Sequence, residues 1–113
     1  MSTYSNNNSN NNIPLGSDFK MNVHMDNIDG YSMDDVDFKC VFYTKSSKKV
    51  VLPKDEMIPI RDSNYVSYVA PLHSLDLGIG ALKIVYEADI PDNDFDNALR
   101  HEIVPITTDI KIV

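Results

Sequence analysis

The sequence has a single cysteine, few basic residues and no long apolar run, and each scarcity excludes a class of protein. Cys40 has no partner for a disulfide within one chain, which suits a reducing compartment. No stretch approaches the roughly 20 apolar residues that span a bilayer, and the first residues lack the basic flank and apolar core of a secretory signal. We therefore expect no membrane partner and no export.

Acidic residues clearly outnumber basic ones. The sequence has 10 Lys and Arg residues against 17 Asp and Glu residues, which gives a formal net charge of −7. An acidic surface repels phosphate, so nucleic acid is not an expected partner. A chain of 113 residues is expected to form one domain around one core.

The N-terminal segment 1–17 has no charged side chain and is rich in asparagine and serine. Such a polar run cannot offset the entropy lost on ordering, so we expect a disordered arm. Asparagine side chains can also satisfy an extended backbone laid along another protein, and the alternative is an arm that orders on assembly. Ile13, Pro14 and Leu15 would then form its apolar anchor and are predicted to bind a partner.

From residue 18 onward, apolar and polar residues alternate with a period of two, which predicts strands with one buried face. The expected strands lie near residues 19–25, 36–43, 50–52, 65–70, 81–88, 100–104 and 110–113. About seven strands, with turn signals at roughly 8–12-residue spacing, are typical of a sandwich. The sequence therefore predicts an all-β domain over residues 18–113.

Two segments are expected to form exposed sheet edges. Pro53 and Pro59 bracket residues 54–58, and proline cannot donate to a β-ladder, so this piece is predicted to be an edge strand or an irregular crossover. The second candidate edge is residues 110–113. Free edges accept a strand from another protein, so Ile110 and Ile112 are predicted partner-binding residues, and symmetric self-pairing would give a homodimer.

No group of residues has the pattern of a catalytic site. Ser74 follows His73, but neighbours in sequence do not make a triad, and no nucleophile turn or oxyanion loop accompanies them. The carboxylates of residues 89–96 lack an apolar cage that would raise a pKa towards neutrality. We expect no catalytic residue and no enzymatic activity.

Metal and cofactor motifs are incomplete. Residues 92–96 have the alternating oxygens that open a calcium loop, but Asn97 and Ile103 stand where that loop needs Gly and Glu. His24, His73 and His101 lie in three separate segments. We expect a solvated acidic turn, ordinary polar histidines, no metal and no cofactor.

Several tyrosines leave a second function open. Exposed tyrosines favour contact with proteins or sugars, whereas Tyr65, Tyr68 and Tyr86 have burial between two sheets as an equal alternative. The alternative function is therefore a carbohydrate-binding module, with a glycan as ligand.

Several motifs occur in a distinctive order. They are Tyr31-Ser32-Met33-Asp34-Asp35-Val36-Asp37-Phe38, Phe42-Tyr43-Thr44, Leu77-Gly78-Ile79-Gly80-Ala81-Leu82, Ile90-Pro91-Asp92 and Leu99-Arg100-His101-Glu102. Over residues 18–113 the chain resembles a domain of tailed-phage virions. It is similar to the N-terminal domain of baseplate-upper and fibre-attachment proteins, especially those of crAss-like phages of gut bacteria.

The resemblance implies an immunoglobulin-like β-sandwich that serves as a structural adaptor without catalytic residues. It also implies localisation in the virion, assembly in the bacterial host cytoplasm, and capsid, fibre or tail proteins as partners. Under the carbohydrate-binding alternative, the glycan would belong to the host surface. Similar proteins usually continue into a distal region, whereas this sequence stops at Val113. We therefore expect a head fibre on the capsid, with a tail or baseplate adaptor as the alternative.

Overall fold

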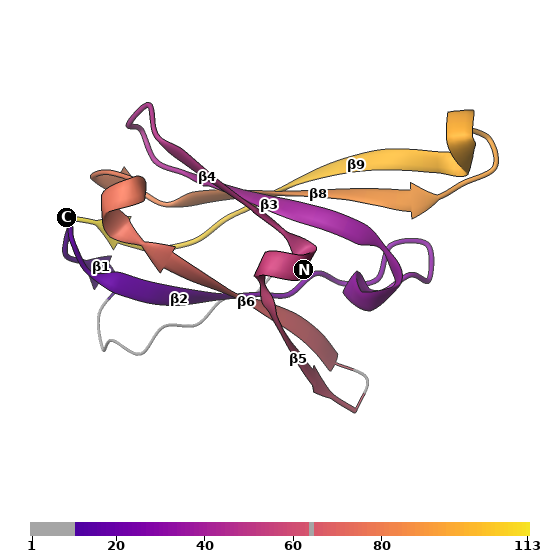
Figure 1. Cartoon of the computed structure of the whole chain (residues 1–113), viewed down its shortest axis with the longest axis horizontal. Helices are drawn as coiled ribbons and strands as arrows, with labels where there is room; N and C mark the ends of the chain where they lie inside the picture. Colours follow the sequence, from indigo (N-terminus) through magenta and orange to yellow (C-terminus); the bar gives the residue numbers. More distant parts are fainter. Residues whose placement is uncertain (1–10, 64) are drawn as a thin grey trace.

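Two facing sheets and a short third sheet make up the fold in the computed structural model, which describes residues 11–63 and 65–113 (Figure 1). The strands are β1 (Asn12–Ile13), β2 (Asp18–Val23), β3 (Asp37–Tyr43), β4 (Lys49–Pro53), β5 (Ile58–Asp62), β6 (Tyr65–His73), β7 (Gly80–Ala81), β8 (Lys83–Pro91), β9 (Leu99–Ile106) and β10 (Lys111–Ile112). Single 3₁₀ turns are η1 (Met33–Asp35), η2 (Lys54–Glu56), η3 (Ser74–Asp76) and η4 (Asp96–Ala98). No helix in the described residues is long and apolar enough to cross a bilayer.

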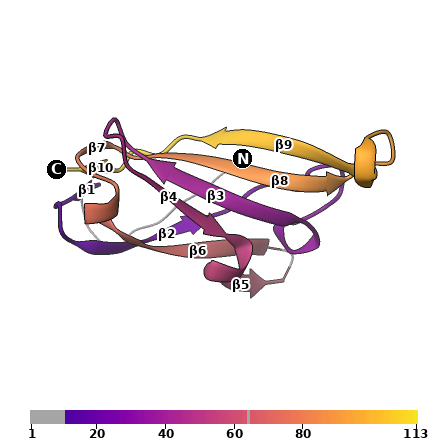
Figure 2. The ribbon, with the colours of Figure 1, turned by 45° about the horizontal axis from the view of Figure 1, so that its top comes forward.

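One layer is a four-stranded sheet in the order β4-β3-β8-β9, and the other is a three-stranded sheet in the order β2-β6-β5 (Figure 2). All pairings within these two sheets are antiparallel. The all-β sandwich predicted from the sequence is confirmed. The immunoglobulin-like strand order that the resemblance implies stays a prediction.

The period-two pattern places one face of each sheet in a common core. On β3, Phe38, Cys40 and Phe42 are buried, and the register sets Cys40 opposite the buried Tyr86 of β8. Tyr68 of β6 faces them from the other sheet, with its ring 5.0 Å from that of Phe38 in an edge-to-face arrangement. Full burial of a side chain such as Phe38 or Phe42 contributes about 1.5–3 kcal/mol, so the alternation favours two sheets packed over one core.

The short third sheet closes one end of the sandwich. β10 lies between β1, to which it is parallel, and β7, to which it is antiparallel. Ile13, Ile110 and Ile112 are each 1% exposed within the chain. This corrects the expected role of these three residues, because side chains buried in their own domain present no surface to a partner. The C-terminal strand also has no free edge in the described structure.

Residues 11–17, which the sequence assigned to the arm, belong to the folded part. The Leu15 N–H donates to the Val113 carbonyl at 2.8 Å. The Gly16 N–H donates to Ser74 Oγ at 2.7 Å, and that hydroxyl donates to the Pro14 carbonyl at 3.2 Å. Pro14 and Leu15 remain exposed. The rest of the predicted arm, residues 1–10, lies outside the described residues.

Gly78 is required where η3 leads into β7. Its φ of +81° is a conformation that other residues rarely adopt, and a Cβ there would lie 2.8 Å from Ser46 Oγ. Ser46 sits at the tip of the β3–β4 hairpin, and its hydroxyl donates to the Leu77 carbonyl at 2.5 Å. The close approach of these two loops explains why the bend into β7 needs a glycine at position 78.

Candidate partner-binding edge

β5 is the strand of the described structure in which every residue is exposed. Its two large apolar residues, Ile58 and Ile60, are 52% and 44% exposed. β6 pairs with one side of β5, and no strand in residues 11–63 and 65–113 pairs with the other side. Such an edge presents unpaired backbone donors and acceptors to solvent. Only Ile58 of the proline-bracketed segment 54–58 belongs to this edge strand, which continues past Pro59 to Asp62.

The crossover from one sheet to the other positions β5. η2 carries the chain from the end of β4 to the start of β5, and Lys54 anchors it. The Lys54 ammonium donates to the Asp34 carbonyl at 3.0 Å and to the Val36 carbonyl at 2.7 Å. It also lies 5.7 Å from the centre of the Phe38 ring, within the range of a cation–π contact. The predicted irregular crossover is therefore confirmed over η2.

A polar network anchored on Asp34 fixes the start of the crossover and β5 to the core. The Asp34 carboxylate accepts hydrogen bonds from Tyr68 Oη at 2.6 Å and from Arg61 Nε and Nη2 at 2.8 and 3.1 Å. The Arg61 guanidinium, and then the Tyr68 hydroxyl, lower the pKa of Asp34. Burial, followed by the nearby carboxylate, raises the pKa of Tyr68 to about 12. The carboxylate is thus ionised and the phenol protonated near neutral pH, so both bonds persist.

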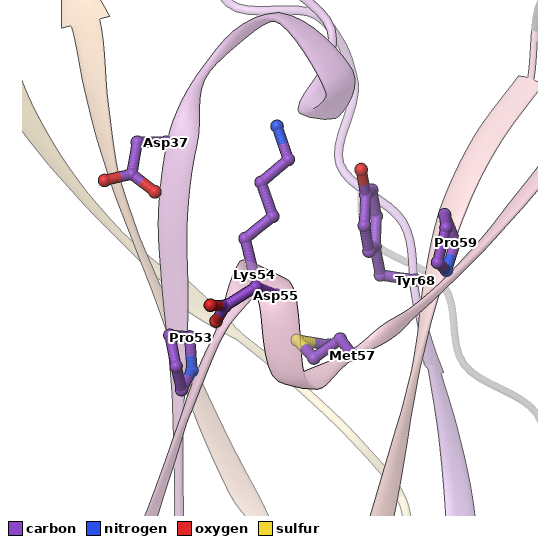
Figure 3. Close-up of a pocket in the computed structure, with 7 residues that line it drawn as sticks. All are labelled: Asp37, Pro53, Lys54, Asp55, Met57, Pro59 and Tyr68. Carbon is purple, nitrogen blue, oxygen red and sulfur yellow. The ribbon is translucent and has the colours of Figure 1, made fainter.

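A groove of about 580 Å³ opens beside this edge strand (Figure 3). Its lining residues come from both sheets and from the crossover; they are Asp37, Pro53, Lys54, Asp55, Met57, Pro59 and Tyr68. The Tyr68 ring and the Met57 side chain form apolar wall, and both residues are almost fully buried. In Figure 3 the Lys54 side chain runs towards η1, away from Asp55. The groove combines apolar walls with two exposed carboxylates, Asp37 and Asp55.

The residues weighed for nucleophilic catalysis have structural partners. Ser74 is fully buried, with its hydroxyl bound to backbone of the N-terminal segment. The His73 ring lies 2.6 Å from Asp18 Oδ1, which raises the pKa of His73, and it faces away from the core in an exposed position. Burial raises the pKa of the Cys40 thiol to about 12, so this cysteine is a core residue and not a reactive thiolate at neutral pH.

The acidic turn after β8 is held by Arg100, which forms ion pairs with Asp29 and Asp92. The Asp94 N–H donates to the Asp92 carboxylate at 3.0 Å, and this bond, followed by Arg100, lowers the pKa of Asp92. Within the described part of the chain, no group of three or more His, Cys, Asp or Glu side chains is placed to hold a metal ion. Residues 93–99 of this turn are exposed, whereas the Asp92 side chain is 18% exposed beside Arg100.

The structure places two of the three tyrosines that could be buried in the core and the third at the surface. Tyr68 and Tyr86 are 2% exposed and belong to the core. Tyr65 is 42% exposed, but one face of its ring stacks on His24 at a centroid distance of 4.2 Å. Two of the three rings in question are therefore unavailable to a sugar.

The Asp34 network is the feature of this candidate site that sequence analysis did not predict. Asp34 is 27 residues from Arg61 and 34 residues from Tyr68, so no local sequence pattern predicts this network. The bracketing prolines predicted an edge strand or a crossover over residues 54–58, but nothing in the sequence predicted an edge strand that runs to Asp62 or the groove beside it. No family model, no curated protein and no solved structure matches this chain.

Proposed function

We propose that the chain is a non-enzymatic virion structural protein of a tailed bacteriophage, which forms or attaches a fibre on the capsid through protein–protein contacts. The motif order of residues 18–113 and its resemblance to fibre-attachment domains support this proposal. The full exposure of β5 is the structural observation that carries it, because a rigid, open and partly apolar edge suits docking.

The proposed mechanism is strand addition at β5. A strand of the capsid or fibre protein pairs with the free side of β5, and backbone hydrogen bonds supply the affinity. Pro59 removes one N–H donor from that edge, which limits uncontrolled pairing between copies. Ile58 and Ile60 are covered when the partner strand is seated, and this burial adds to the free energy of binding.

The groove gives this edge a means of selecting its partner. A side chain from the added segment enters between Pro53 and Pro59, with the carboxylates of Asp37 and Asp55 exposed beside it. Apolar walls with acidic neighbours fit a lysine or arginine, whose stem is apolar and whose head is positive. We therefore expect the partner segment to be extended and to carry a basic residue. A tail or baseplate protein with such a segment is the alternative partner.

Incorporation into particles tests the proposal. The double variant Ile58→Lys/Ile60→Lys changes only exposed side chains of β5, so the melting temperature should stay near that of the wild type. The matched control is Ile79→Lys, since Ile79 is 52% exposed and lies outside β5. Quantitative mass spectrometry of purified phage particles should show the double variant depleted at least about tenfold and the control at wild-type copy number.

Wild-type incorporation of the folded double variant would refute β5 as the attachment surface. If the wild-type chain is absent from purified particles and binds an arrayed glycan as a monomer, the virion proposal fails and the carbohydrate-binding alternative takes its place.

A further inference from the structure

The outer face of the four-stranded sheet carries a continuous apolar row that crosses all four strands. The strand register aligns Val51 of β4, Val41 of β3, Val85 of β8 and Pro105 of β9. These residues alternate with the buried core positions, so they point away from the core. Val51 is 50% exposed and Pro105 is exposed, and both valines between them are half-buried by their neighbours on the same face. We call this set the apolar row.

Charges on the same face are sorted to opposite sides of the apolar row. On one side of the row, Lys83 lies two residues before Val85 along β8. It pairs with Tyr43, two residues after Val41 along the antiparallel β3, and Tyr43 is in turn opposite Lys49. One step after the apolar row on β8 lies Glu87, and beyond that a row joins Asp37 and Asp89. The basic residues on this side are Lys39, which the register sets opposite Glu87, and His101, whose ring lies 3.2 Å from the Glu87 carboxylate and 2.9 Å from that of Asp89. The face thus has a positive side, an apolar centre and a side that is acidic on balance.

If a second copy of the chain is placed on this face by a suitable two-fold rotation, the positive side of each copy lies over the acidic side of the other. When the axis lies along the apolar row, β8 of one copy crosses antiparallel over β8 of the other, and the valines meet at the centre. Lys83, two residues before Val85, then faces Glu87 of the second copy, two residues after it, and the contact occurs twice. An axis parallel to the strands would instead set lysines over lysines, so the charges select the first arrangement.

We propose that two copies of the chain associate through this face, with the apolar row on the two-fold axis and reciprocal Lys83–Glu87 ion pairs. The occupant is a second copy because the face complements its own charge order. The inference does not depend on partner binding at β5, which belongs to the other sheet.

The area of this face sets the expected affinity of the dimer. Four strands about 4.8 Å apart, over about six residue steps of 3.4 Å, give a flat footprint on the order of 400 Å². A standard interface buries about 800 Å² per partner, so this dimer should be reversible, with a dissociation constant in the micromolar range or weaker.

A charge swap tests the contact in the full chain. Sedimentation velocity at increasing protein concentration should show a monomer–dimer equilibrium for the wild type. Lys83→Glu and Glu87→Lys should each raise the dissociation constant at least about tenfold, because like charges then meet twice. The double variant Lys83→Glu/Glu87→Lys restores opposite charges and should return the constant to within about threefold of the wild type.

Two controls carry the same charge changes elsewhere. Lys20→Glu lies on β2 and Glu56→Lys on η2, both exposed and outside the four-stranded sheet, and neither should alter dimerisation. Val51→Lys should weaken the dimer independently of the ion pairs, since Val51 meets its own copy across the axis. The Ile58→Lys/Ile60→Lys variant should still dimerise, which separates a failure here from a failure at β5.

A wild-type chain that stays monomeric up to about 1 mM would overturn the inference and leave this face to a different partner. Single variants that dimerise like the wild type, or a double variant no better than the singles, would also overturn it.

Discussion

The C-terminal strand β10 and the edge strand β5 have similar compositions, but in the structure their edges differ. β10 has a paired strand on each side, and its Ile112 is 1% exposed. β5 has one neighbour in the described structure, and its Ile58 is 52% exposed. Both segments are short and rich in isoleucine, so composition does not distinguish a closed edge from an open one. Pairing partners from distant parts of the chain make the difference.

The largest expected contrast lies in stability. Ile112→Ala should lower the free energy of unfolding by about 2–4 kcal/mol, because it leaves a cavity among packed side chains. Ile58→Ala should change it by less than about 0.5 kcal/mol, because that side chain is half in solvent already. Urea denaturation of both variants checks this, and equal effects would mean that β10 and β5 do not differ as described.

A loop variant probes how the closed end is held. Gly78→Ala should lower the free energy of unfolding by about 2–3 kcal/mol, since it combines a positive φ with a clash against Ser46. Gly30→Ala is the matched control: its φ is also positive, at +85°, but nothing lies within 4 Å of the new Cβ, so about 1 kcal/mol is expected. Thermal unfolding of the two variants should rank them in that order, and the reverse ranking would contradict the close approach of the two loops.

Substitutions in the Asp34 network should lower the free energy of unfolding less than core substitutions do, but more than substitutions of exposed β5 residues. Asp34→Ala removes the acceptor of the Tyr68 hydroxyl and both bonds from Arg61, which should cost about 1–3 kcal/mol. Tyr68→Phe removes only one of these bonds and should cost about 1 kcal/mol. Urea denaturation gives both values. If the two variants are equally destabilised, Arg61 contributes nothing to holding β5.

The smallest expected effect is a pH dependence at His101, on the outer face of the four-stranded sheet. The His101 ring lies 2.9 Å from Asp89 and 3.2 Å from Glu87, and these carboxylates, Asp89 first, raise the pKa of the imidazole. A raised folded-state pKa stabilises the fold fully below the ordinary value of 6.5, and this contribution disappears as the pH rises through the folded-state value. The wild type should therefore have a higher free energy of unfolding than His101→Asn at about pH 5.5, and this difference should shrink as the pH rises to about 8.5.

NMR titration of the His101 ring measures the same shift directly. A folded-state pKa at or below 6.5 would show that the two carboxylates do not hold the protonated ring.

Much of the architecture could be predicted from the sequence because period-two burial is a local signal. The alternation of Phe38, Cys40 and Phe42 predicts β3 and its buried face, and the polar tip before Val50 predicts the hairpin to β4. The paired prolines predict an edge strand or an irregular crossover, and residues 54–56 form the crossover. These features depend on residues close together along the chain.

The closed end and the anchored crossover could not be predicted in this way. Asn11 bonds to Asp109 across 98 residues, and Ile13 is buried only because β10 lies beside it. An apolar residue in a polar low-complexity segment carries no local sign of such a partner. The same holds for Asp34 in η1, one carboxylate among many, whose role arises from Arg61 on β5 and Tyr68 on β6.

Hydrogen exchange of the free chain and of the assembled particle tests the open edge most directly. In the free chain, the amides of Lys111 and Val113 should exchange slowly, since they donate to the carbonyls of Asn11 and Ile13 at 2.9 Å. On assembly, the account predicts new protection on the free side of β5 and no further change in β10. New protection at β10 with none at β5 would contradict it.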